Sequence, residues 1–220
     1  MQNLTLLEED EESFFGRLVT MDECWVYLYD PETKEMSKEW KHSTSPPPKN
    51  AKVQKSRGKV MLSVFWDCRG VILTDYLEEG RTITGAYYCT LLKKLRGALK
   101  EKRRGKLKNG VLPLADNAPA HSSQVATDEA TRCCYEILPH PPYSPDLAPS
   151  DFVLFPEMKN PLRGRRFDDR DDVIEEVEQW FAGQSEEFYD GGLRKLRNGG
   201  RSVWPGVGTT WRSSECHVAK

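Results

Sequence analysis

Three aspartates stand where folding alone does not readily explain a carboxylate. Asp22 lies inside the apolar, β-prone stretch 17–30. Asp116 directly follows the apolar run 111–115, and Asp151 follows a proline-dense loop, with 34 residues between these two acids. A carboxylate inside a buried strand needs a partner or a metal ion, because an isolated buried charge is costly. We therefore treat the three aspartates as candidate metal ligands.

Such a set of ligands would support one kind of chemistry. Carboxylates that converge repel one another, so their cluster is tolerable only if a cation neutralises it. Hard oxygen ligands select Mg²⁺ or Mn²⁺ over zinc. Two such ions about 4 Å apart would clamp the attacking and leaving oxygens of a phosphodiester, without any nucleophilic side chain.

Each candidate also has a purely structural explanation. Asp22 could face water from an edge strand. Asp116 with Asn117 could form a turn, and Asp151 could be an acid favoured at a helix start. His121 could cap the helix that follows it. Taken singly these explanations are the better ones, but together they do not explain why the acids follow strand ends and a rigid loop.

The hydrophobic pattern predicts the elements that would position these residues. Strands are predicted at 17–30, 59–66, 71–77, 111–115 and 135–138. Thr84 is predicted to cap a helix with an apolar stripe at Tyr88, Leu91, Leu92, Leu95 and Leu99. Further helices are predicted after Ser122 or Ser123, after Ser150 and from Asp171. This order predicts an α/β domain with a mixed five-stranded sheet flanked by helices.

The remaining segments lack periodicity. Residues 1–16 are interpreted as a linker, or the tail of a missing upstream domain, that carries no core by itself. Residues 31–58 are interpreted as a long irregular loop inserted in a domain spanning 17–196. No structure is predicted for 197–220. The Pro161 position is unfavourable in the interior of a helix.

Composition narrows the class of protein. The chain has 220 residues, 38% hydrophobic and 30% charged, with a formal net charge of −2, which is typical of a globular protein. No apolar run approaches the roughly 18 residues of a membrane helix, and the acidic N-terminus is unlike a secretory signal. Six cysteines without a C-x-x-C pair argue against zinc or a disulfide framework and for the cytosol or nucleus.

A basic run occupies residues 93–108. By itself such a run is more often a solvated face than a binding surface. If the chain binds nucleic acid, the candidate contacts are Lys93, Lys94, Arg96, Lys100, Lys102, Arg103 and Arg104.

Three blocks carry a resemblance to a known family: VTMDECW at 19–25, LADNAPAH at 114–121 and YEILPHPPYSPDLAPSDFVLF at 135–155. They resemble the catalytic blocks of mariner-type (mariner/Tc1 superfamily) transposases, including the Tyr-Ser-Pro-Asp-Leu signature at 143–147. A third aspartate at 151, where retroviral integrases have glutamate, favours the mariner branch. The similarity extends from about Phe14 to Leu196.

The resemblance implies an RNase H-like fold of the retroviral integrase superfamily. It implies that Asp22, Asp116 and Asp151 bind two Mg²⁺ or Mn²⁺ ions, that the enzyme cuts DNA at transposon ends, and that it joins the 3′ ends to a TA target. It also implies a homodimer formed through the 31–58 loop, DNA contacts by the basic run, and a nuclear location.

The chain departs from the family pattern in several places. The helix-turn-helix region that precedes the catalytic domain in the family is absent, Met21 replaces a Gly, and Ala115 replaces a His. The sequence of 197–220 suggests a frameshift near Asn198. These departures keep open an alternative, a decayed or domesticated DNA-binding protein without full transposition activity. A nuclease acting on RNA–DNA hybrids fits the fold but not the Tyr-Ser-Pro-Asp-Leu block.

Overall fold

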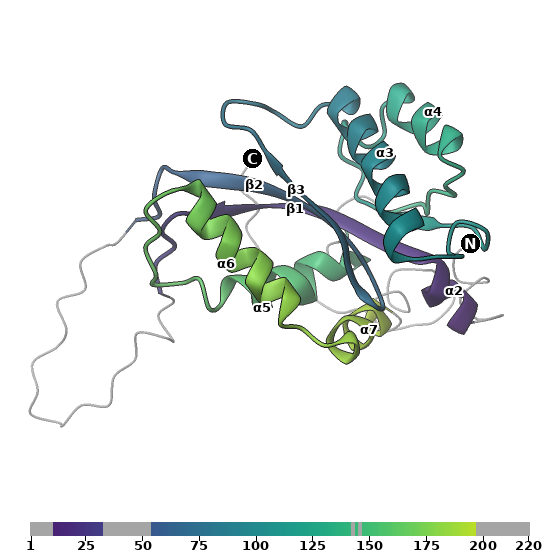
Figure 1. Ribbon diagram of the computed structural model, residues 1–220. Coiled ribbons are helices and arrows are strands. Elements are labelled where there is room, and N and C mark those ends of the chain that lie inside the picture. The colour runs from purple at the N-terminus through teal and green to yellow at the C-terminus, as the bar shows by residue number, and fades with distance from the viewer. Residues whose placement is uncertain (1–10, 33–53, 142–143, 145–146, 197–220) are drawn as a thin grey trace, which may run out of the picture.

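A four-stranded mixed sheet organises the computed structural model, which describes residues 11–32, 54–141, 144 and 147–196 (Figure 1). The strand order is β3-β2-β1-β4, with β1 antiparallel to β2, β2 antiparallel to β3, and β1 parallel to β4. The strands are β1 (Leu18–Tyr27), β2 (Lys59–Asp67), β3 (Gly70–Leu77) and β4 (Leu112–Leu114). The mixed sheet is as predicted, and β1 lies in its interior.

The predicted fifth strand at 135–138 is not formed. This segment meets β4 through a single parallel bridge between Val111 and Tyr135. Its amides still donate, from Glu136 to the Val111 carbonyl and from Leu138 to the Pro113 carbonyl, both at 3.0 Å. Pro113 has no N–H to return a hydrogen bond, so the parallel ladder cannot continue.

Helices cover both faces of the sheet (Figure 1). Alternate residues of β1 divide between two cores: Val19 and Met21 pack under α3 and α4, whereas Cys24 and Val26 join the core under α5, α6 and α7. The helices are α2 (Glu11–Arg17), α3 (Gly85–Lys102), α4 (Gln124–Arg132), the π-helical turn η2 (Ser150–Leu154), α5 (Phe155–Lys159), α6 (Arg170–Ala182) and α7 (Glu186–Arg194). None of these helices is long and apolar enough to cross a membrane.

The predicted signals for α3 are confirmed. Thr84 is the N-cap residue, and its side chain accepts a hydrogen bond from the Tyr87 amide. All five residues of the apolar stripe are buried. Pro161 does not interrupt a helix, because α5 ends at Lys159.

The prediction that residues 1–16 carry no core is wrong for 11–16. Phe14 and Phe15 in α2 are 5% and 1% exposed and belong to the core beside α7. Glu11 and Glu12 occupy the first turn of α2, where acids are favoured by the helix dipole. Much of the 31–58 loop and the Tyr-Ser-Pro-Asp-Leu signature, and all of 197–220, lie outside the described residues.

Candidate active site

Asp22 and Asp116 lie at the same level of two neighbouring parallel strands. The backbone ladder between β1 and β4 runs in register up to the pair Thr20–Leu114. Each aspartate follows its strand's member of that pair by two residues. β1 is an interior strand of the sheet, but at Asp22 it is paired only with β2, because the ladder to β4 ends two residues earlier.

Asp151 comes from η2, which packs against β1. The preceding residue, Ser150, is buried, and its hydroxyl accepts a hydrogen bond of 3.0 Å from the indole N–H of Trp66 in β2. This buried contact anchors the first turn of η2, which carries Asp151, to the sheet.

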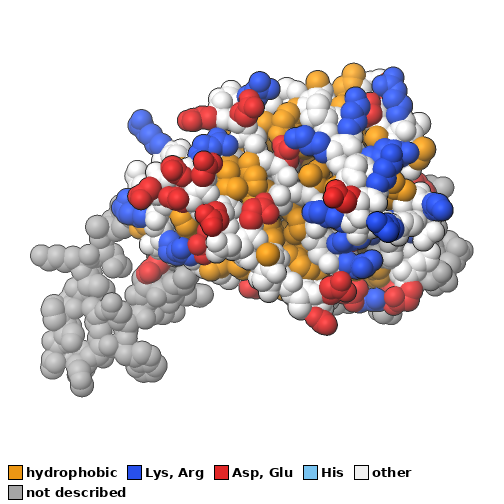
Figure 2. All heavy atoms as spheres, in the orientation of Figure 1, with side chains coloured by type: hydrophobic (Ala, Val, Ile, Leu, Met, Phe, Trp, Pro, Cys, Tyr) orange, Lys and Arg blue, Asp and Glu red, His pale blue; other side chains and the backbone are white. Residues whose placement is uncertain are grey.

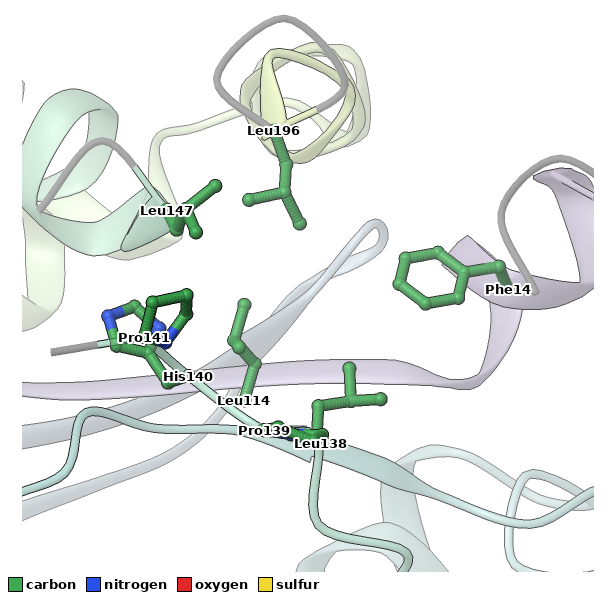
Figure 3. Close-up of a pocket in the computed structure, with 8 residues that line it drawn as sticks. All are labelled: Phe14, Leu114, Leu138, Pro139, His140, Pro141, Leu147 and Leu196. Atoms are coloured by element: carbon green, nitrogen blue, oxygen red, sulfur yellow. The ribbon is translucent and has the colours of Figure 1, made fainter. Parts of the chain in front are cut away.

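The proline-dense loop packs against the end of β4 and the turn that follows it. Leu114 at the end of β4 and Leu147 near the end of the loop line one small apolar pocket, together with Phe14 and Leu196 (Figure 3). Asn117, next to Asp116, donates a hydrogen bond from its side-chain amide to the carbonyl of His140 in the loop. The loop is therefore held against the turn that carries Asp116.

The three carboxylates form one electrostatic neighbourhood. Burial raises the pKa of Asp22 well above its usual range, and the charge of Asp151 raises it further, with smaller effects from Glu23 and Asp116. Burial also raises the pKa of Asp151; Lys159 opposes that shift and Asp116 adds to it. Burial is the largest cause of both pKa shifts, and the repulsion between the carboxylates adds to it; a bound cation would relieve that repulsion.

Sequence reasoning missed the roles of His121 and Glu23. The His121 ring bridges two acids, with Nδ1 2.7 Å from Asp116 Oδ1 and Nε2 3.0 Å from Glu23 Oε1. Burial alone lowers the pKa of His121, but the hydrogen bonds to Asp116 and Glu23 raise it to about 10. The hydrogen bond from His121 holds the pKa of Asp116 below its usual range. The available signals were the second acid beside Asp22 and a histidine five residues after Asp116.

The side-chain oxygens suit a hard divalent cation. Asp22 uses Oδ1 to accept the Glu23 amide at 2.7 Å, and Asp116 uses Oδ1 to accept the Ala118 amide at 3.0 Å and the His121 ring. In the described part of the chain, no hydrogen bond engages Oδ2 of either aspartate. Among the described residues, no group of three or more acidic, histidine or cysteine side chains is arranged so that it could hold a metal ion. The donor chemistry fits Mg²⁺ or Mn²⁺, with oxygens left uncommitted by the fold.

The two departures flanking the aspartates lie on the α3 side of the sheet. Met21 is 3% exposed and Ala115 packs against the same core. Neither side chain supplies a polar group beside the acids.

The seven basic candidates do not form one uniform surface. Lys and Arg side chains gather over the part of the molecule that contains α3 (Figure 2). Lys93 and Lys94 form ion pairs with Glu129 and Asp75, and their side chains remain 63% and 54% exposed. Lys100 and Arg104 are exposed. These four side chains are available at the surface.

The other three candidates make structural contacts. Arg96 donates to the Cys133 carbonyl, and Lys102 donates to the Ile72 carbonyl at 2.9 Å. Arg103 pairs with the buried Asp67, and its side chain is only 12% exposed. The DNA contact predicted for Arg103 therefore stays a prediction, for a side chain that is already engaged by Asp67.

Comparisons with known proteins identify the family. Residues 30–109 match a family model described as a transposase, partial DDE domain, a stretch that contains none of the three aspartates. The chain is 38% identical over 187 residues to the Mariner Mos1 transposase of Drosophila mauritiana, covering 84% of this chain and 53% of the relative. It is 32% identical over 192 residues to the human histone-lysine N-methyltransferase SETMAR, covering 87% of this chain and 28% of that protein. The chain thus spans about half or less of the curated relatives it matches.

Solved structures extend the similarity to three dimensions. The crystal structure of the Mos1 mariner paired end complex with Mn matches with a TM-score of 0.81 at 36% identity, over 90% of this chain and 58% of the other. The crystal structure of the catalytic domain of Mos1 mariner transposase matches with a TM-score of 0.71 at 35% identity, over 90% of this chain and 85% of that domain. Because the similarity in sequence and structure extends over most of this chain and over 85% of the Mos1 catalytic domain, this chain belongs to the mariner-type transposases and has their RNase H-like fold.

Proposed function

We propose that the chain is a transposase catalytic domain that cleaves DNA at transposon ends and joins the 3′ ends to target DNA. The observation that carries this proposal is that Asp22, Asp116 and Asp151, from β1, the turn after β4 and η2, interact electrostatically. The carboxylates influence one another's pKa. The similarity to a structure of the Mos1 strand transfer complex supports the same reaction class.

Asp22, Asp116 and Asp151 are the proposed ligands of two Mg²⁺ or Mn²⁺ ions. Related Mos1 structures contain Mn or Mg. Bound ions of this kind activate an attacking hydroxyl and stabilise the departing oxygen of a phosphodiester. The protein's own contribution is to hold the three carboxylates on separate elements around that position.

The proposed partner is DNA, both transposon ends and target. The related Mos1 complexes include one with the left transposon end. Lys93, Lys94, Lys100, Lys102 and Arg104 are the exposed candidates for contacts with phosphates, and Arg96 and Arg103 are half-buried. A homodimer formed through residues 31–58 and a nuclear location complete this proposal.

The proposed domain division places the catalytic domain at about 11–196, preceded by a linker to a DNA-reading domain and followed by the tail 197–220. Its N-terminal boundary now includes α2, because Phe14 and Phe15 belong to the catalytic core.

A domesticated or decayed copy that binds DNA without completing transposition is the second candidate. It is favoured by Met21 and Ala115, which bring no polar group to the site, and by similarity to part of a protein named as a histone-lysine N-methyltransferase. The intact carboxylates favour the first candidate.

The test is a nicking and strand-transfer assay on DNA carrying transposon ends, with Mg²⁺, Mn²⁺ or chelator. The first candidate predicts metal-dependent nicking that is lost in Asp116→Ala. The matched control is Asp128→Ala, which removes an exposed acid from α4. Nicking that survives chelation or Asp116→Ala refutes the site. DNA binding without nicking in either metal selects the second candidate.

A further inference from the structure

The backbone pairing of β1 and β4 ends before it reaches the aspartates. Its last pair is Thr20 with Leu114, and no backbone hydrogen bond links the two segments beyond that point among the described residues. The separation of Asp22 from Asp116 is therefore not set by the sheet itself. A side chain has to fix it if the two acids are to share a cation.

The His121 side chain spans this gap. Its Nδ1 lies 2.7 Å from Asp116 Oδ1, and its Nε2 lies 3.0 Å from Oε1 of Glu23, the neighbour of Asp22 in β1. The bridge therefore joins the turn after β4 to β1 just past the end of their ladder.

The bridge is built into the core and the turn. The His121 residue is 7% exposed, and its ring lies against the Tyr88 ring of α3 with centroids 4.4 Å apart. Its amide donates to the Ala118 carbonyl at 2.9 Å, and the Ala118 amide donates to Asp116 Oδ1 at 3.0 Å. The ring therefore has little freedom to leave the two carboxylates.

We propose that His121 is a positioning residue that fixes the Asp116 carboxylate relative to Asp22, using Glu23 as its anchor on β1. The arrangement occupies Oδ1 of Asp116 and keeps Oδ2 for a divalent cation. This inference rests on the proposed function, because it takes Asp22 and Asp116 to be metal ligands. His121 itself touches neither cation nor substrate.

The test measures Mn²⁺ affinity of the whole chain without DNA, from the electron paramagnetic resonance signal of free Mn²⁺. His121→Phe keeps a ring against Tyr88 and removes both hydrogen bonds. Because loss of a residue that orients a metal ligand costs about 10–100-fold in metal affinity, the Kd is expected to rise by that factor. Asp128→Asn is the control on α4 and is expected to bind Mn²⁺ like the parent.

A second pair of variants separates the hydrogen bond from the charge. Glu23→Gln keeps an oxygen that accepts the Nε2–H of His121, so its Kd is expected to stay close to the parent's. Glu23→Ala removes the acceptor and is expected to weaken Mn²⁺ binding as His121→Phe does. A merely structural histidine would change the melting temperature of these variants without this order of affinities. The Glu23 pair also decides the question if His121→Phe does not fold.

The outcomes distinguish this inference from the metal site. If Asp116→Asn loses Mn²⁺ binding while His121→Phe and Glu23→Ala keep the parent's Kd, the positioning role is overturned and the metal site stands. If Asp22→Asn and Asp116→Asn both bind Mn²⁺ like the parent, the metal site is overturned, and the inference with it.

Discussion

A buried charge cluster behind the site offers a stringent test of the fold. Asp67, at the end of β2, is 0% exposed. Its carboxylate accepts hydrogen bonds from the Arg103 guanidinium at 3.1–3.2 Å and from Lys106 Nζ at 2.8 Å. Lys106 Nζ also donates to the Leu18 carbonyl at 3.0 Å, so the cluster joins the segment after α3 to the first residue of β1.

Asp67→Asn keeps the side-chain shape and removes the only described carboxylate that pairs with these two cations. Breaking a buried ion pair by removing one partner costs about 3–5 kcal/mol, because the remaining charge is left uncompensated. At 2–4 °C per kcal/mol for a chain of this length, the melting temperature is expected to fall by roughly 6–20 °C. Urea unfolding is expected to show a lower midpoint at an unchanged slope.

The controls for this prediction use the same charge change elsewhere. Asp128→Asn, on the surface of α4, is expected to change the free energy of unfolding by no more than about 0.5 kcal/mol. Adding Lys106→Met to Asp67→Asn removes one uncompensated cation, so the double variant is expected to lose less stability than the two single losses added together. A loss below about 1 kcal/mol in Asp67→Asn would refute the reasoning that the cluster is dry and charged.

The same ion pairs, the Trp66–Ser150 hydrogen bond and the exposed lysines of α3 each carry one further prediction. Burial alone raises the pKa of Asp67, but Arg103 and Lys106 hold that pKa below its usual range. The contribution of Asp67 to stability is therefore present above the unfolded pKa of about 3.9 and is lost as pH falls through the lower folded pKa. In urea titrations, the stability advantage of the parent over Asp67→Asn is expected to shrink below about pH 4. Ser150→Ala leaves the indole N–H of Trp66 buried without its hydrogen-bond acceptor, so the free energy of unfolding should fall by about 1–3 kcal/mol. DNA nicking should also be lost, because the neighbouring Asp151 is displaced. Unchanged stability would contradict the buried hydrogen bond. Lys93, Lys94 and Lys100 are replaced by Gln one at a time. Where the lysine contacts a phosphate, the slope of the logarithm of the DNA-binding constant against the logarithm of the salt concentration should fall in magnitude by about 0.9. An unchanged slope excludes that contact.

The strands and α3 could be predicted because their signals are local. The apolar stripe of α3 repeats at helical spacing, and Thr84 stands directly before it. The parallel arrangement that aligns Asp22 with Asp116 was a hypothesis about topology, and the sheet order confirms that β1 and β4 are neighbours. The prediction of a fifth strand was wrong because Pro113 has no backbone N–H to donate to it, and the hydrophobic pattern alone does not show this.

Roles that depend on distant partners could not be predicted from pattern. The run 93–108 has the pattern of a charged surface, yet Arg103 and Lys106 point inward because both pair with Asp67, the buried last residue of β2. The role of His121 could not be predicted for the same reason. Its partner Glu23 is 98 positions away in the chain, and only the folded structure brings Glu23 Oε1 within 3.0 Å of the ring.

The register of β1 decides which of two adjacent acids, Asp22 or Glu23, faces the proposed metal site. Successive side chains of a strand point to opposite faces, so Asp22 belongs with Cys24 and Val26 on the face of η2 and α5, whereas Glu23 meets His121 on the α3 face. A slip of one residue would exchange them and would also turn the buried residues of β1 toward the wrong cores. The long antiparallel pairing of β1 with β2 prevents that slip, because it continues through the level of both acids after the β4 ladder has ended. The chemistry assigned to Asp22 thus depends on β2, a strand that contributes none of the three carboxylates.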